Sequence, residues 1–263
     1  MLYLNGQPVP VTIFPDKTSQ VWKLPESVFS CPSHHIEWVF ESEGEFIHLA
    51  QLVNLLSLKS HYAPYLHLTL KYLPYGRQDK QVANDATFAL RTFAILLNSL
   101  SFDSVRIIDP HSRVALDLIS NSEEININSW LFPVVEECGS DLLCYPDKGA
   151  HSKYCNNLIL PQPYIYGEKV RDQATGNILS YSIVGDPADK NVLIVDDICD
   201  GGMTFKLLAK DLLAAGAKSV VLFVTHGIFS KGLQTLKDSG IQRIFTQDGE
   251  ASEEAGQIIY RRL

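Results

Sequence analysis

A short stretch late in the sequence, NVLIVDDICDGGMTF (191–205), holds the residues best suited to chemistry. Its apolar start predicts a strand buried on both faces, and Asp196 and Asp197 close that strand. A turn of small residues then leads into a predicted helix, and its members are Asp200, Gly201, Gly202, Met203 and Thr204. Backbone N–H groups at a helix N-terminus suit a phosphate, and glycines let the backbone approach it closely.

Carboxylates beside such a turn would repel a phosphate, so Asp196 and Asp197 need another partner. The vicinal hydroxyls of a ribose fit, because each carboxylate accepts a charge-assisted hydrogen bond from a hydroxyl. The stretch therefore predicts a ribose phosphate site, with the acids on the sugar and the turn on the 5-phosphate. In a plainer alternative, the two aspartates only end a strand and Asp200 caps the helix. Cys199 is a candidate nucleophile, although a small filler residue is its more ordinary role.

The composition is that of a globular protein and excludes some classes. The chain has 263 residues, 46% hydrophobic and 20% charged, which is enough for two modest domains or one large one. The net charge of -8, without any run of Lys or Arg, argues against nucleic-acid binding. The sequence lacks an apolar run of about 18 residues and a secretory signal pattern, so no membrane partner is expected. Five unevenly spaced cysteines without a C-x-x-C pair predict free thiols in a reducing cytoplasm.

Strand-like and helix-like segments alternate along the chain, which predicts parallel sheets covered by helices. The first half contains predicted strands and helices in alternation, namely strands at 11–14, 35–40, 65–73 and 104–109 and helices at 45–60 and 86–100. A polar, aperiodic stretch at 121–129 predicts a boundary between a domain at 1–125 and one at 126–263. The second half repeats the alternation, with strands at 141–146, 157–161, 191–197 and 219–227 and helices at 204–216 and 231–240.

The opening stretch resembles the signature of phosphoribosyltransferases and of ribose-phosphate diphosphokinases, the PRPP synthetases. Two other segments favour the second family, because transferases with the same loop lack them together. YLPYGRQDK (72–80) is similar to that family's ATP-binding segment, and the matching residues are Arg77, Gln78 and Asp79. GEKVRD (167–172) is similar to its catalytic K-x-R segment, and the matching residues are Lys169 and Arg171.

Four further segments resemble this family in its own order along the chain. FPD (14–16) is similar to a loop that covers adenine from a neighbouring subunit. IIDPHS (107–112) is similar to a segment whose histidine, here His111, helps to hold magnesium and ATP. CYPDKGAHSK (144–153) is similar to P-D-A-G-G, which places Asp147 near the metal and the ribose. VTHGIFS (224–230) matches the end of a late strand in the family.

The resemblance implies an α/β fold of two doubly wound, phosphoribosyltransferase-like domains with mostly parallel sheets, the first for ATP and the second for a ribose phosphate. The extreme C-terminus is a candidate to pack back on the first domain. The implied reaction moves the β,γ-diphosphoryl group of ATP onto the 1-hydroxyl of ribose 5-phosphate and requires Mg²⁺. Lys169 and Arg171 would neutralise charge in the transition state. Phe14 and Asp16 would cover the adenine of a neighbouring subunit, so a homo-oligomer is expected.

The phosphate turn departs from the family, which usually reads D-T-x-x-T where this chain reads D-G-G-M-T. One hydroxyl is gone at Gly201, and Met203 stands where glycine is usual. A phosphodiester suits such a turn better than a terminal phosphate, so ADP-ribose is a second candidate acceptor. The chain is similar to a short, divergent branch associated with NAD salvage. A non-catalytic regulatory subunit is a further alternative, against which the intact Lys169 and Arg171 argue.

Overall fold

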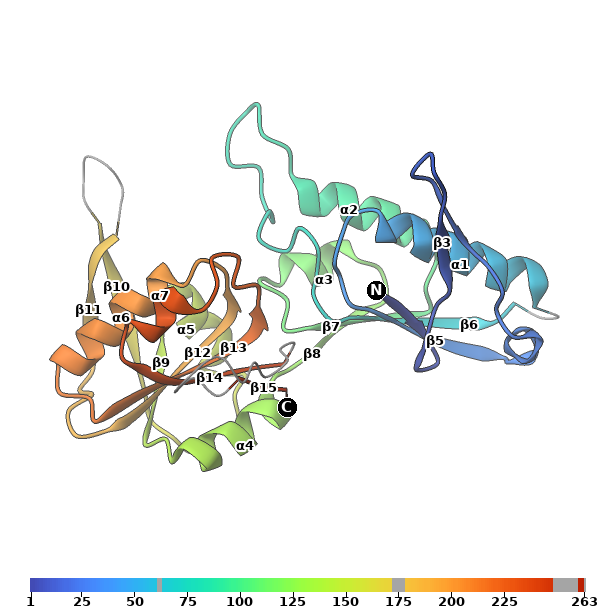
Figure 1. Ribbon diagram of the computed structural model, residues 1–263. Coiled ribbons are helices and arrows are strands. Elements are labelled where there is room, and N and C mark those ends of the chain that lie inside the picture. The colour runs from blue at the N-terminus through green and yellow to red at the C-terminus, as the bar shows by residue number, and fades with distance from the viewer. Residues whose placement is uncertain (61–62, 172–177, 248–259, 263) are drawn as a thin grey trace. The chain divides into compact units, whose positions relative to one another are not determined.

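The computed structural model describes residues 1–60, 63–171, 178–247 and 260–262, with side chains left undescribed at 169–171, 178–181 and 260–262 (Figure 1). The chain consists of two compact units, Met1–Ile125 and Asn126–Leu263. Each unit has its own large sheet, and no strand is shared between the sheets of the described residues. None of the described helices is long and apolar enough to cross a membrane.

The first unit is built on a six-stranded sheet with the order β2-β1-β5-β6-β7-β8. These strands are β1 (Leu2–Leu4), β2 (Gln7–Pro8), β5 (Ser33–Trp38), β6 (Tyr65–Leu70), β7 (Ser104–Ile108) and β8 (Ser122–Ile125). The last four run parallel, and β1 is antiparallel to both of its neighbours. The helices α1 (Glu45–Lys59), α2 (Ala89–Asn98) and α3 (Val114–Leu118) connect the parallel strands. A 3-10 helix (Glu26–Ser30) and a separate hairpin of β3 (Val11–Ile13) and β4 (Ser19–Val21) complete the unit.

The helices of the first unit cover one face of its sheet (Figure 1). Ile36 of β5, Leu68 of β6 and Ile107 of β7 point from neighbouring strands into a single core, and each is fully buried. The residues between them are polar and pair across strands: His35 is hydrogen-bonded to Thr69 (2.8 Å), and His67 to Ser104 (2.8 Å). The alternation of apolar and polar residues therefore sets which face of this sheet is covered.

The second unit is built on a seven-stranded sheet with the order β11-β10-β9-β12-β13-β14-β15. These strands are β9 (Leu142–Tyr145), β10 (Tyr164–Arg171), β11 (Ile178–Val184), β12 (Asn191–Cys199), β13 (Ser219–Gly227), β14 (Ile241–Thr246) and β15 (Tyr260–Arg262). Only β11 is antiparallel to its neighbour. The helices of this unit are α4 (Asn128–Cys138), α5 (Lys148–Tyr154), α6 (Met203–Ala214) and α7 (Gln234–Lys237). The extreme C-terminus adds β15 to this second sheet.

Two separate cores lie on the two faces of the second sheet. Ile194 in β12 packs with Leu208 of α6, whereas its neighbours Leu193 and Val195 pack with Leu131 of α4. A strand buried on both faces reads as a continuous apolar run, which explains the sequence NVLIV. The chain passes from β9 to β10 in one direction along the sheet and from β12 to β13 in the other. The junction of β9 and β12 is therefore the switch point at which open α/β sheets bind ligands.

The predicted fold class is confirmed: two mostly parallel sheets are flanked by helices. The strand predicted at 157–161 is wrong, because that segment is an irregular connection between α5 and β10. The Asn128 side chain satisfies its backbone, accepting from Ile159 N–H (2.9 Å) and donating to the Asn157 carbonyl (3.1 Å). The polar stretch at 121–129 holds the edge strand β8 and the first turn of α4, neither of which its composition predicts.

The turn between β12 and α6 depends on the backbone of Gly202. This residue has a φ of +74°, in the left-handed region that favours glycine, and a Cβ added there would lie 3.1 Å from Leu236 Cγ. A Cβ at the adjacent Gly201 would lie no nearer than 3.5 Å to its closest neighbour, an ordinary contact. The two glycines thus have different roles, since only Gly202 is required by the backbone.

We expect Gly202→Ala to lower the free energy of unfolding by about 1–2 kcal/mol, because a left-handed backbone is strained with a Cβ. Gly201→Ala is the matched control, and we expect it to change stability by less than about 0.5 kcal/mol. Urea denaturation of the two variants beside the unaltered protein measures both effects. Equal losses at the two positions would contradict the role of Gly202.

Candidate functional site

Two adjacent carboxylates lie at the carboxyl end of β12, next to the switch point. β12 pairs with β9 only as far as Ile194, so Asp196 and Asp197 extend beyond the end of that neighbour. On the other side the strand stays paired with β13 up to Cys199. The two carboxylates are therefore held by a rigid strand at an edge where the sheet opens, as ligand-binding acids in α/β sheets are.

The carboxyl of Asp196 is held in an unfavourable electrostatic environment. Its Oδ1 accepts a hydrogen bond from the Asp197 N–H (3.0 Å). Burial raises the pKa of Asp196 well above its usual value, and the negative charges of Asp197 and Asp147 raise it further. Lys153 of α5 lies 3.6 Å from Asp197 Oδ2, and both side chains are largely buried. Among the described side chains, Lys153 is a cation beside these carboxylates, and the pKa of Asp196 is still raised, so the site favours hydrogen-bond donors or a cation.

The turn after these acids runs from Asp200 to Thr204 and leads into α6. Gly202 is the N-cap residue of α6, and no side chain caps that end of the helix. The cap role considered for Asp200 is therefore wrong: its Oδ1 accepts a hydrogen bond from the Ser230 hydroxyl instead. Met203 is 56% exposed, and Thr204 is half-buried. α6 thus begins with backbone N–H groups that a phosphate oxygen suits.

Asp147 follows β9, the neighbour of β12, and the predicted catalytic pair lies in β10, on the other side of β9. Asp147 comes just after β9 and caps α5, with its Oδ1 accepting from the Ala150 N–H (3.0 Å). Lys169 and Arg171 lie in β10, opposite Tyr181 and Ile178 of β11, with a β-bulge between Val170 and Arg171. Their backbone is described and their side chains are not, while Asp172 lies outside the described residues.

Cys199 ends β12 and belongs to the core between the sheet and α6. Burial, followed by the charges of Asp196 and Asp200, raises the pKa of its thiol to about 12. A thiol must be ionised to act as a nucleophile, so Cys199 has the packing role rather than the catalytic one. All five cysteines are free thiols, as their spacing predicts.

The predicted ATP-binding residues of the first unit follow two adjacent parallel strands. Arg77, Gln78 and Asp79 lie in the connection from β6 to α2, and His111 follows β7. Because the carboxyl ends of β6 and β7 meet at the same edge, both segments lie on that edge of the sheet. Gln78 is tied into its turn, with its N–H donating to the Tyr75 carbonyl (2.8 Å). Arg77 and His111 have exposed side chains.

Phe14 and Asp16 lie in the turn of the separate β3–β4 hairpin. Asp16 Oδ1 accepts from the Thr18 hydroxyl (2.7 Å) and from the Thr18 N–H (3.0 Å). These hydrogen bonds lower the pKa of Asp16. Phe14 is 37% exposed and its neighbour Ile13 is 60% exposed. The hairpin therefore presents apolar side chains to solvent.

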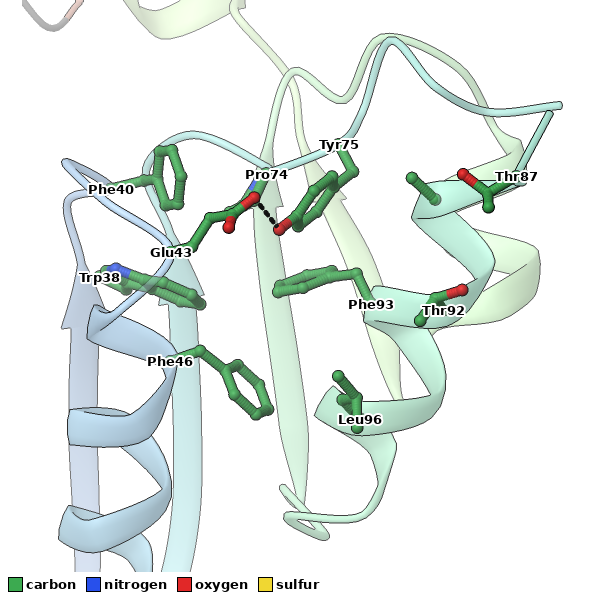
Figure 2. A pocket seen from close by; sticks show the side chains of 11 residues that line it. Trp38, Phe40, Glu43, Phe46, Pro74, Tyr75, Thr87, Thr92, Phe93 and Leu96 are labelled. Atoms are coloured by element: carbon green, nitrogen blue, oxygen red, sulfur yellow. Dashed lines mark hydrogen bonds between the residues drawn. The ribbon is translucent and has the colours of Figure 1, made fainter. Parts of the chain in front are cut away.

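An aromatic pocket of about 310 Å³ lies in the first unit, and the sequence did not reveal it (Figure 2). Its walls are five rings drawn from four separate segments: Trp38, Phe40, Phe46, Tyr75 and Phe93. At its mouth the Tyr75 hydroxyl donates to Glu43 Oε1 (2.6 Å), and this bond, followed by burial, raises the pKa of Tyr75. Tyr75 has a left-handed φ of 62°, and it stands two residues before Arg77. The pocket suits a flat, apolar group.

The predicted metal contacts, His111 and Asp147, belong to different units. Among the described residues, no group of three or more His, Cys, Asp or Glu side chains is placed to hold a metal ion. Mg²⁺ is commonly bound by one or two carboxylates together with the phosphates of a substrate. The crowded carboxylates of Asp147, Asp196 and Asp197 fit that kind of binding, in which the substrate supplies the remaining oxygen ligands.

Known proteins with similar sequences point to one family. A model of the phosphoribosyl transferase domain matches residues 154–254, which include β12, the turn and α6. The ribose-phosphate pyrophosphokinase of Corynebacterium efficiens is 27% identical over 212 residues, 76% of this chain and 64% of that protein. The enzyme of that name from Pyrococcus abyssi is 30% identical over 172 residues, 64% of this chain and 59% of that protein. For several of these curated relatives the chain spans only 60% to 64% of their length.

A solved structure shares the fold over nearly the whole chain. It is the crystal structure of phosphoribosylpyrophosphate synthetase from Mycobacterium smegmatis, with a TM-score of 0.79 and 21% sequence identity. The match covers 97% of this chain and 85% of that one. The chain is thus similar in sequence, at about 27% identity, to the ribose-phosphate pyrophosphokinases, also called PRPP synthetases, and it shares the fold of one solved structure of that name.

Proposed function

We propose that the chain transfers the β,γ-diphosphoryl group of ATP to the 1-hydroxyl of a ribose phosphate, with release of AMP. The observation that carries this proposal is the pair of carboxylates at the end of β12, followed by a glycine turn at the N-terminus of α6. Hydroxyl donors from a ribose would relieve the crowded acids, and the turn would hold the 5-phosphate. The family resemblance adds ATP as the donor.

In the proposed step, a bond forms between the 1-oxygen of the ribose and the β-phosphorus of ATP. The bond from the β-phosphorus to the oxygen that bridges it to the α-phosphorus breaks, and AMP leaves with that electron pair. The hydroxyl proton is released to solvent. Little covalent chemistry is left to the protein in such a transfer, so positioning and charge neutralisation carry most of the catalysis.

The residues divide into a donor set and an acceptor set. Arg77, Gln78, Asp79 and His111 are proposed to bind ATP, and Asp147, Asp196, Asp197 and the turn to bind the ribose phosphate. Lys169 and Arg171 lie in β10, the strand next to β9, and their cations would stabilise charge on the transferring phosphates. Mg²⁺, when bound to the substrate phosphates, supplies further neutralisation of that charge. Asp147 and His111 are the proposed protein contacts of the metal.

The acceptor is proposed to be ribose 5-phosphate, and ADP-ribose is a second candidate. One observation favours the second: Met203, in the first turn of α6, is 56% exposed, so a substituent beyond the 5-phosphate has an apolar side chain to contact. Transfer to ADP-ribose would give ADP-ribose 1-diphosphate, a donor for rebuilding NAD from nicotinamide. The exposed Phe14 is proposed to cover the adenine of a neighbouring subunit in a homo-oligomer.

We expect purified protein with ATP and Mg²⁺ to release AMP when ribose 5-phosphate or ADP-ribose is added. Chromatography of the nucleotides identifies the acceptor from the product, PRPP or ADP-ribose 1-diphosphate. Ribose without a phosphate is the control, because it leaves the turn empty. If no AMP is released with either acceptor, the proposed transfer is rejected and a non-catalytic regulatory protein is favoured.

We expect Lys169→Ala to lower kcat about 10³-fold, because a preorganised cation at the transferring phosphates is lost. Phe14→Ala should raise KM for ATP strongly. If Phe14 acts across a subunit contact, mixing these two variants should restore part of the activity, since each hybrid contains one intact site. Circular dichroism checks that both variants are folded. Near-normal turnover by Lys169→Ala would reject its role, and a mixture without recovery would reject the shared site.

We expect Asp196→Asn to abolish AMP release and yet raise the melting temperature at about pH 7.5. The pKa of Asp196 is raised in the folded protein, so ionisation costs stability once the pH exceeds the ordinary value near 3.8. The gain from asparagine should therefore shrink as the pH falls towards about 4. Asp189→Asn is the control, because Asp189 is exposed and its left-handed φ of 58° suits asparagine. A lower melting temperature for Asp196→Asn at neutral pH would contradict the charge crowding.

A further inference from the structure

The loop after β13 packs against the phosphate turn, although the two are separated in sequence. The carbonyl of Cys199 accepts hydrogen bonds from the N–H groups of Ile228 (2.9 Å) and Phe229 (3.1 Å). The next residue, Ser230, donates its hydroxyl to Asp200. These contacts hold residues 228–232 beside the start of α6.

This packing lays the side chain of Lys231 along Gly201. A Cβ added to Gly201 would lie 3.5 Å from Lys231 Cδ, 3.7 Å from Cε and 4.0 Å from Nζ. The space beside Gly201 is therefore occupied by the lysine stem, and a branched side chain at 201 would have to share it. Gly201 does not have a left-handed φ, so its backbone does not require glycine, and the stem of Lys231 lies at ordinary contact distance from the position that its Cβ would take.

Lys231 brings an exposed ammonium to the turn at which a hydroxyl is missing. The pattern that the turn resembles, D-T-x-x-T, has threonine at the position of Gly201, and a threonine hydroxyl can donate one hydrogen bond. An ammonium has three donors and a full charge on a flexible stem, so it reaches further and binds a phosphate as a point charge. Backbone N–H groups at the uncapped N-terminus of α6 would donate to the same phosphate.

We propose that Lys231 binds the phosphate at the 5-position of the acceptor and replaces the missing hydroxyl at residue 201. This inference rests on the proposed function, because it concerns the acceptor of that reaction. The shared chemistry is a phosphate linked to the ribose 5-oxygen. It can come from a monoester, as in ribose 5-phosphate, or from a diphosphate linkage, as in ADP-ribose.

The test measures acceptor binding without turnover, by calorimetric titration with ribose 5-phosphate and separately with ADP-ribose. We expect Lys231→Ala to weaken binding of the true acceptor about 10- to 100-fold, as the loss of a charge-assisted hydrogen bond does. Lys231→Arg should retain most of the affinity. Lys210→Ala is the matched control, because Lys210 is an exposed lysine on α6, remote from its first turn, and should bind normally.

A second arm tests the pairing of Lys231 with Gly201. We expect Gly201→Thr alone to weaken binding, because threonine and lysine compete for one space. The double variant Gly201→Thr/Lys231→Ala should bind better than Lys231→Ala alone, because the threonine hydroxyl then has room. Additive effects of the two substitutions would overturn the pairing.

The outcomes separate the inference from the proposed function. If Lys231→Ala binds both acceptors as tightly as the unaltered protein does, the inference is overturned and the transfer reaction stands. If the protein binds an acceptor through Lys231 but releases no AMP from ATP, the transfer reaction is overturned and the inference stands. Failure to bind either ribose phosphate overturns both.

Discussion

Crowding of carboxylates at the carboxyl ends of β12 and β9 constrains the organisation of the second unit. The half-buried Asp196 lies beside the buried Asp197, and desolvation together with the charges of Asp197 and Asp147 raises the pKa of Asp196. β12, which carries Asp196 and Asp197, is a central strand packed on both faces. This packing holds the two carboxylates in place at the end of the strand. Lys153 forms an ion pair with Asp197. The protein thus holds a local electrostatic cost that a ligand rich in hydroxyl groups would relieve.

Each unit has a sheet edge formed by the carboxyl ends of its parallel strands, and the two edges carry different side chains. In both, the relevant residues follow the carboxyl ends of adjacent parallel strands, where backbone geometry brings them together. The first unit presents Arg77 and His111, which suit a polyphosphate, and the second presents acids and a glycine turn, which suit a sugar phosphate. A transfer between two substrates needs both kinds of edge. Each edge belongs to a sheet with its own core, so the side chains of one edge do not affect the packing of the other unit.

The sequence predicts the parts of this structure that depend on local patterns. The strand at 219–227 is predicted to the residue, because a long apolar run is bounded by turns on both sides. Patterns fail where a partner distant in the chain decides the structure. Asn128 satisfies the backbone of a segment that reads as a strand at 157–161, and β8 is polar because it is an edge strand. The same holds for the site: Asp196 and Gly202 are evident from spacing, whereas Lys153 and the aromatic pocket are assembled only by folding.

The anchoring of the loop after β13 on the Cys199 carbonyl has a consequence for how such a protein changes over time. The loop is tied to the residue at which the turn begins, because two of its N–H groups donate to the Cys199 carbonyl at the end of β12. Phe229 packs against the core, whereas Ser230 and Lys231 are exposed, so substitutions at these two positions cost the core little and still alter the surroundings of the turn. Under the proposed function, acceptor preference would therefore change through exposed residues of this loop, while the strands and both cores of the second unit stay the same.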